Sequence, residues 1–249
     1  MTQSPTLDGL AREFADKLTD LTKGVLGEDA PRFHAIELAE DRRVRVQPIW
    51  DDEKARPIPV RIAGIHRISL VVTYDCCWDV ARTFLATDKS AVKVLYEGSQ
   101  DPLFRFEYER RMKDPPGAHF HVHAHRDEVA YLLRLSESGR PGRQLKHNRL
   151  PRLAELHMPV GGHHMRPSLE DALLFLVREF AIDTADGWEG VLGRHREEWR
   201  LVQLGAAVRD APETAAAVLR KLGYDVTTPP SVPGPREGAL SAENKLFFP

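Results

Sequence analysis

The stretch Gly117-Ala-His-Phe-His-Val-His-Ala-His125 carries a histidine at every second position. Successive side chains of an extended strand point to opposite faces, so the alternation predicts a strand with imidazoles on one face and Phe120, Val122 and Ala124 on the other. The apolar face is suited to packing. The other face is suited to chemistry, because imidazole titrates near neutral pH, binds metals and transfers protons. The first candidates for catalytic residues are His119, His121, His123 and His125.

A two-residue period of apolar positions runs from Pro31 to about Leu135. Turn-forming residues such as Ala63-Gly64 and Gly98 to Pro102 separate its segments, which favours hairpins in an antiparallel sheet or partial barrel. Residues 78–87 fit a helix or a strand equally. The expected strands are 33–38, 44–50, 58–62, 65–74, 92–96, 104–108, 119–125 and 129–135.

Helical spacing of apolar residues flanks this sheet region on both sides. Residues 7–26 predict an amphipathic helix, and Ser168 is a candidate N-cap for the first of three C-terminal helices. The predicted fold class is therefore α+β, with the helices packed on the sheet. The expected organisation is an N-terminal helix (1–30), an antiparallel β domain with the His-rich strand (31–166), a C-terminal three-helix segment (167–226) and a flexible tail (227–249).

Composition excludes several classes of protein. The 249 residues have a net charge of -2, which argues against nonspecific coating of nucleic acid. No apolar stretch approaches the ~20 residues of a membrane helix, and the first residues lack the pattern of a signal peptide, so we expect a cytoplasmic protein without membrane contact. The adjacent Cys76 and Cys77 are expected to be reduced thiols. Because the chain has no phosphate-binding glycine loop, no nucleotide cofactor is indicated.

A basic segment follows the histidines, between Arg134 and Arg152. Its cations are suited to hold phosphates while paired imidazoles act as general base and general acid on a phosphodiester. The alternative is a solvated connecting loop. The candidate substrate-binding residues are Arg140, Arg143, Lys146 and Arg149.

Two acidic residues, Glu107 and Glu109, lie two positions apart on an expected strand. On the face of the histidines they would accept hydrogen bonds and fix an imidazole tautomer. Our expectation from the sequence is that both are exposed to solvent.

Residues 121–164 resemble the metal-binding pattern of cupins, His-x-His-x(4)-Glu followed by Pro-x-Gly-x-x-His. His121, His123 and Glu128 match the first part, and Pro159, Gly161 and His164 match the second. The resemblance implies a small barrel that binds one iron, manganese, zinc or nickel ion. The ligands that it implies are His121, His123, Glu128 and His164.

Residues 100–125 resemble TumE-like toxins of toxin-antitoxin pairs, in which an aromatic strand bearing an arginine precedes a His-rich one. The matching residues are Phe104-Arg-Phe-Glu-Tyr108 and the His-x-His strand. This resemblance implies a catalytic role for Arg105 beside the histidines.

Three functions are consistent with these features. The leading one is a His-dependent enzyme that cleaves RNA or another phosphodiester, as a nuclease of toxin or defence type, with or without a metal. The second is a cupin-like mononuclear metalloenzyme acting on a small molecule. The third is a non-catalytic adaptor, in which the C-terminal helices bind a protein partner or a second copy of the chain.

Overall fold

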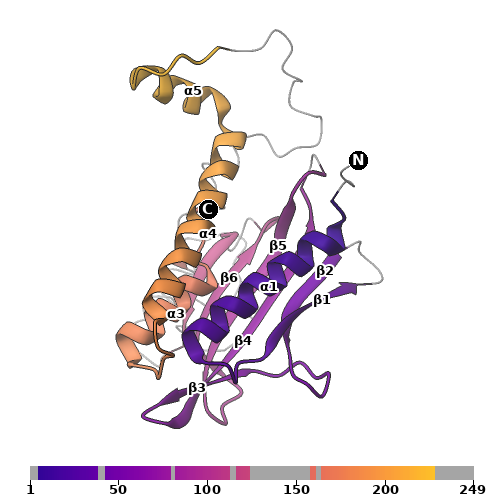
Figure 1. The fold of residues 1–249 in the computed structure, drawn as a ribbon, viewed down its shortest axis with the longest axis vertical. Coiled ribbons are helices and arrows are strands. Elements are labelled where there is room, and N and C mark those ends of the chain that lie inside the picture. Colours follow the sequence, from indigo (N-terminus) through magenta and orange to yellow (C-terminus); the bar gives the residue numbers. More distant parts are fainter. Residues whose placement is uncertain are drawn as a thin grey trace, which may run out of the picture.

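A computed structural model of the protein describes residues 5–38, 43–79, 82–112, 116–123, 158–160 and 164–227. It confirms the α+β class, with an N-terminal helix, an antiparallel sheet and C-terminal helices (Figure 1). The elements are α1 (Leu7–Leu26), β1 (Arg32–Leu38), β2 (Arg43–Ile49), β3 (Ile58–Ile62), β4 (Ile65–Trp78), β5 (Leu85–Tyr96), β6 (Pro102–Glu109), β7 (Ala118–Val122), β8 (Met158–Pro159), α3 (Leu169–Phe180), α4 (Trp188–Asp210) and α5 (Pro212–Lys221).

The strands form one antiparallel sheet in the order β1-β2-β4-β5-β6-β7-β8, and β3 also pairs with β4. The long strand β4 joins the two halves, because it pairs with β2 and β3 along one edge and with β5 along the other. Residues 78–87, which the sequence left open, contain the end of β4 and the start of β5. The expected strand 129–135 lies outside the described residues.

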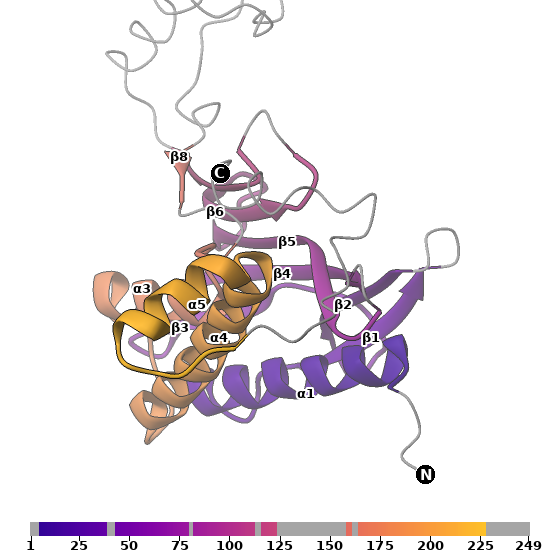
Figure 2. The same ribbon diagram turned by 90° about the horizontal axis from the view of Figure 1, so that it is seen from above.

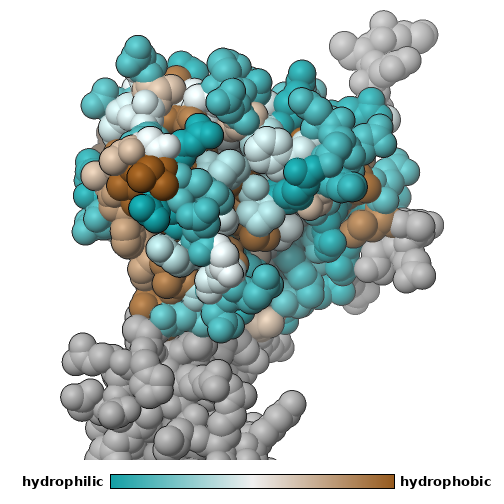
Figure 3. Space-filling model, turned by 90° about the horizontal axis from the view of Figure 1, so that it is seen from below, coloured by the Kyte–Doolittle hydropathy of each residue, from teal (hydrophilic) through white to brown (hydrophobic). Residues whose placement is uncertain are grey.

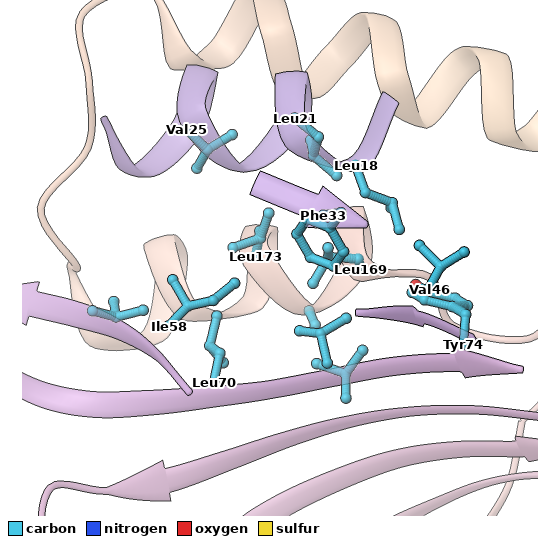
Figure 4. Close-up of a cluster of buried hydrophobic side chains, with 14 of the residues drawn as sticks. Leu18, Leu21, Val25, Phe33, Val46, Ile58, Leu70, Tyr74, Leu169 and Leu173 are labelled. Carbon is cyan, nitrogen blue, oxygen red and sulfur yellow. The ribbon is translucent and has the colours of Figure 1, made fainter. Parts of the chain in front are cut away.

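Helices α1, α3 and α4 lie on one face of this sheet, which we call the apolar face (Figure 2). Leu21 of α1, Leu70 of β4 and Leu173 of α3 are each fully buried there, between the helices and the strands (Figure 4). Burial of one such side chain contributes about 1.5–3 kcal/mol to folding. Helices α1, α3 and α4 therefore share one core with the sheet, whereas α5 contributes no buried residue to it.

Local interactions explain how α3 and α4 are held in place. Ser168 is the N-cap of α3, as the sequence predicted, and it forms a capping box with Asp171. The Asp171 carboxylate also accepts hydrogen bonds from Arg196 and Arg200 of α4. Where α4 crosses α1, a Cβ atom on Gly24 would lie 2.6 Å from Val191, so only glycine permits this close approach.

The surface seen from below is mainly hydrophilic, and its hydrophobic residues form small separate patches (Figure 3). Scattered exposed apolar residues of this kind are usual in globular proteins. None of the helices in the described part of the chain combines the length and apolar character that a membrane span requires.

Candidate functional site

The candidate site lies on the other face of the sheet, which we call the polar face. The antiparallel register of β6 and β7 sets Glu107 opposite His119 and Arg105 opposite His121. Side chains directly opposite each other have Cβ atoms about 4.5–5.5 Å apart, so this pairing brings a carboxylate, a guanidinium group and two imidazoles together.

Glu107, His119 and His121 form a compact cluster, which we call the carboxylate–imidazole cluster. Glu107 Oε2 lies 3.5 Å from His119 Nε2 and 3.3 Å from His121 Nε2. The three potential ligand atoms all lie within 4.8 Å of one another. Two nitrogen donors and one oxygen donor thus converge on a single point.

The imidazoles of this cluster are buried more deeply than its carboxylate. The side chains of His119 and His121 are 5% and 2% exposed, whereas that of Glu107 is 22% exposed. Buried polar groups require partners, because an unpaired polar group away from water is costly. Because Glu107 is the most exposed of the three side chains, solvent reaches the cluster from the carboxylate side.

A backbone carbonyl fixes the orientation of the His119 ring. His119 Nδ1 lies 2.6 Å from the carbonyl oxygen of Pro116. A carbonyl oxygen only accepts hydrogen bonds, so Nδ1 carries the hydrogen in this contact. In the neutral ring, Nε2 then presents its lone pair toward Glu107.

The environment of Glu107 keeps its carboxyl group ionised. Burial raises the pKa of this group, but the adjacent imidazoles of His119 and His121 and the charge of Arg105 outweigh that effect. The pKa of Glu107 therefore lies well below its ordinary value.

Arg105 and His123 extend the site along the strands. Arg105 Nη1 lies 3.5 Å from Glu107 Oε1, and the ring of His123 is centred 6.2 Å from that of His121. Among the described residues, neither Arg105 Nε nor His123 Nε2 has a hydrogen-bond partner, although both atoms are buried. Burial, Arg105 and His121 together lower the pKa of His123, so its ring is neutral at neutral pH.

The cluster opens into a cleft of about 440 Å³ on the polar face, a volume within the usual range of small-molecule sites. Ion pairs border the cleft on β4 and β5: Lys89 lies 2.8 Å from Glu109, and Arg45 lies 2.7 Å from Asp75. The lining residues are Thr73, Asp75, Lys89, Ser90, Ala91, Arg105, Glu107, Tyr108, Glu109, Met112, His119 and His121.

The structure brings together three of the predicted catalytic residues, His119, His121 and Arg105, and His123 lies beside them just past the end of β7. His164 is not part of the cluster; its Nε2 lies 3.0 Å from the carboxylate of Asp210, at the end of α4. Other predicted site residues lie outside the described residues, namely His125, Glu128, Arg140, Arg143, Lys146 and Arg149.

Glu107 was not among the predicted site residues, and the expectation that it is exposed was wrong. Its side chain is largely covered and stands at the centre of the cluster. The two-residue period does place Glu107 on one face with Arg105. Only the pairing of β6 with β7 shows that this face is also that of His119 and His121.

The fold and this site define an α+β protein with a buried carboxylate–imidazole cluster at the floor of a cleft. No protein-family model, curated protein or solved structure matches the chain. The function is therefore inferred from the chemistry of the site.

Proposed function

We propose that the protein is a hydrolase that uses one divalent transition metal bound by Glu107, His119 and His121. The observation that carries this proposal is the convergence of their three donor atoms. Two histidines and a glutamate are the ligand set of several catalytic zinc sites, in which the fourth position holds water or substrate.

The distances within the cluster agree with such a site. Zinc bonds to imidazole nitrogen and carboxylate oxygen of about 2.0–2.2 Å imply ligand atoms about 3.4 Å apart in a tetrahedron. Glu107 Oε2 lies 3.5 Å and 3.3 Å from the two imidazole nitrogens. The two imidazole nitrogens lie within 4.8 Å of each other, so a metal ion in tetrahedral geometry would draw the two rings closer together.

The orientation of His119 also supports a metal. With Nδ1 donating to Pro116, a neutral His119 directs a lone pair at a carboxylate oxygen, and two acceptors repel each other. A cation between them removes the conflict. A histidine ligand that donates its other nitrogen to a backbone carbonyl is the usual arrangement around protein-bound metals.

A metal ion in this site would supply a nucleophile. Bound to zinc, water has a pKa of about 7 instead of 15.7, so hydroxide is present at neutral pH. The open, carboxylate side of the cluster gives a substrate access from the cleft.

A second candidate uses the same residues without a metal. The paired imidazoles would act as the general base and the general acid on a phosphodiester, as in the leading interpretation of the sequence, and Glu107 would orient them. The observation that favours it is the direct contact of both imidazoles with one ionised carboxylate.

Metal binding to untagged protein tests the proposal. Equilibrium dialysis of the stripped protein against Zn²⁺, Mn²⁺, Fe²⁺ or Ni²⁺ should give close to one ion per chain. Glu107→Gln and His121→Asn should each weaken binding more than about 100-fold, because loss of a ligand exceeds the 10–100-fold cost of losing a supporting contact. His34→Asn, on exposed β1, is the matched control.

His164→Asn separates this ligand set from the one implied by the cupin resemblance. Our set predicts full metal binding in this variant, whereas the cupin-like set predicts its loss. Hydrolysis of a panel of activated carboxylic and phosphate esters should stop on chelation and return with the metal. Activity that persists without metal would replace the proposal with the second candidate, and a protein with neither bound metal nor activity would refute both.

A further inference from the structure

We propose that a phosphodiester binds beside the metal, with its anionic oxygens held by an anion subsite made of Arg105, which lines the cleft, and of its neighbours Lys93 and His123, which lie next to the lining residues on the same face of the sheet. This inference rests on the metal-dependent hydrolase proposed above and names the substrate class of the same site.

The first support is an uncompensated row of cations across the sheet. On the polar face, two basic residues stand directly opposite acidic ones, Arg45 opposite Asp75 and Lys89 opposite Glu109. Both pairs form close ion pairs.

Lys93 departs from this pattern, because the residue opposite it is Arg105. Like charges directly across a pair of strands destabilise a sheet. No carboxylate pairs with Lys93 anywhere in the described ranges, and Arg105 has only the 3.5 Å contact with Glu107. The row of Lys93 and Arg105 therefore retains a positive charge, whereas the other basic residues named on this face are neutralised by acidic partners.

The second support is a pair of buried nitrogens without partners. Arg105 Nε is always a donor, and in the parts of the chain that are described nothing accepts from it. His123 Nε2 is also buried and, among the described residues, also lacks a hydrogen-bond partner. The ring of His123 lies beside that of His121. A bound anion would accept a hydrogen bond from Arg105 Nε, and from His123 in the tautomer that carries its hydrogen on Nε2.

The charge of the complete site selects the substrate. A divalent metal with one carboxylate ligand leaves one positive charge, and Arg105 and Lys93 add two more. Neutral esters and peptides make no use of these two cations. A phosphodiester presents two non-bridging oxygens that share one negative charge, so that one can lie on the metal and the other on Arg105, as in other clamps on phosphoryl groups.

The resulting reaction is a simple hydrolysis. Metal-bound hydroxide forms a bond to phosphorus, the bond from phosphorus to the leaving oxygen breaks, and that oxygen takes up the proton released when water became hydroxide. The products are a phosphomonoester and an alcohol. No oxidant or reductant is required.

Binding of dimethyl phosphate to the zinc-loaded protein tests the subsite by calorimetry. Lys93→Met and Arg105→Met should each raise the dissociation constant about tenfold, with metal content unchanged. Lys17→Met, on the exposed side of α1, is the matched control and should bind as the parent does.

The outcomes separate this inference from the proposed function. If neither substitution weakens binding while metal and hydrolysis remain, the anion subsite is refuted and the hydrolase stands. If the protein binds no metal but still binds dimethyl phosphate through both residues, the subsite stands and the metal-dependent hydrolase is refuted.

A second set of assays identifies the source of the phosphodiester. Single-stranded RNA, DNA of the same sequence and bis(p-nitrophenyl) phosphate are compared with p-nitrophenyl acetate. Cleavage of RNA alone, or of all three diesters, supports the substrate class and distinguishes an RNA enzyme from a general phosphodiesterase. Preference for the carboxylic ester would overturn the inference.

Discussion

The two faces of strands β4–β7 bury very different side chains. On the apolar face, Leu70 belongs to a cluster of buried hydrophobic side chains that the helices cover. On the polar face, His119 and His121 are equally inaccessible but contact a carboxylate. Burial of the first kind stabilises the fold directly, whereas burial of the second kind requires compensation by a partner. The contrast suggests that the apolar face serves stability and the polar face serves chemistry.

The largest expected effect comes from opening a cavity in the apolar face. Leu70 is fully buried, so Leu70→Ala should lower the free energy of unfolding by about 2–5 kcal/mol. Its neighbour Val71 points to the polar face and is only half buried. Val71→Ala removes two methyl-sized groups that are already half exposed, so it should cost only about 1 kcal/mol. Equal losses in urea denaturation would contradict the two-faced arrangement.

The next effect should come from the polar face and depend on metal. An ion that binds only the folded state, present at about 100 times its dissociation constant, adds about 2.7 kcal/mol to stability. Zinc should thus raise the Tm of the parent protein and of His34→Asn, and leave His121→Asn unchanged. A similar rise in all three would place the bound zinc elsewhere.

A smaller effect is expected at the start of α3. Ser168→Ala removes the side chain that accepts from the Asp171 backbone and should cost about 1 kcal/mol. Ser168→Thr retains the hydroxyl group and should cost less than half as much. Thermal unfolding of both variants measures how much the cap stabilises α3. Equal losses of stability in the two variants would contradict a stabilising role of the Ser168 hydroxyl group.

The smallest effect concerns Glu170, a buried carboxyl group on the apolar side. Burial raises the pKa of this group and outweighs its hydrogen bond with Ser168. Because the folded pKa exceeds the unfolded one, the fold loses stability as the pH rises and Glu170 ionises.

Glu170→Gln should therefore be more stable than the parent at pH 8, and the difference should fade as the pH falls below the ordinary glutamate pKa. Tm values across this range provide the check. A variant that is less stable at pH 8 would show that the ionised carboxylate supports the fold.

Much of the fold was predictable because it depends on local patterns. The period of apolar residues predicted α1 and the strands β1 to β7, and Ser168 marked the start of α3. These features are determined by neighbouring residues and survive changes of tertiary context. The alternation of histidines likewise placed His119 and His121 on one face.

The site was less predictable because it depends on register. Nothing in the local sequence shows that Glu107 stands opposite His119, since a shift of one residue would move Glu107 to the other face. The contact of His164 with Asp210 joins a loop to the far end of α4 and has no local signature. Sequence spacing alone therefore named the histidines but not their carboxylate partner.

Anomalous diffraction from crystals grown with zinc would test the central claim most directly. We predict one anomalous peak within about 2.0–2.2 Å of Glu107 Oε2, His119 Nε2 and His121 Nε2. His119 Nδ1 should still donate to the carbonyl oxygen of Pro116. A peak at other residues would contradict the assignment of a metal to the carboxylate–imidazole cluster. The absence of any peak, in a crystal in which this hydrogen bond is clearly visible, would contradict it as well.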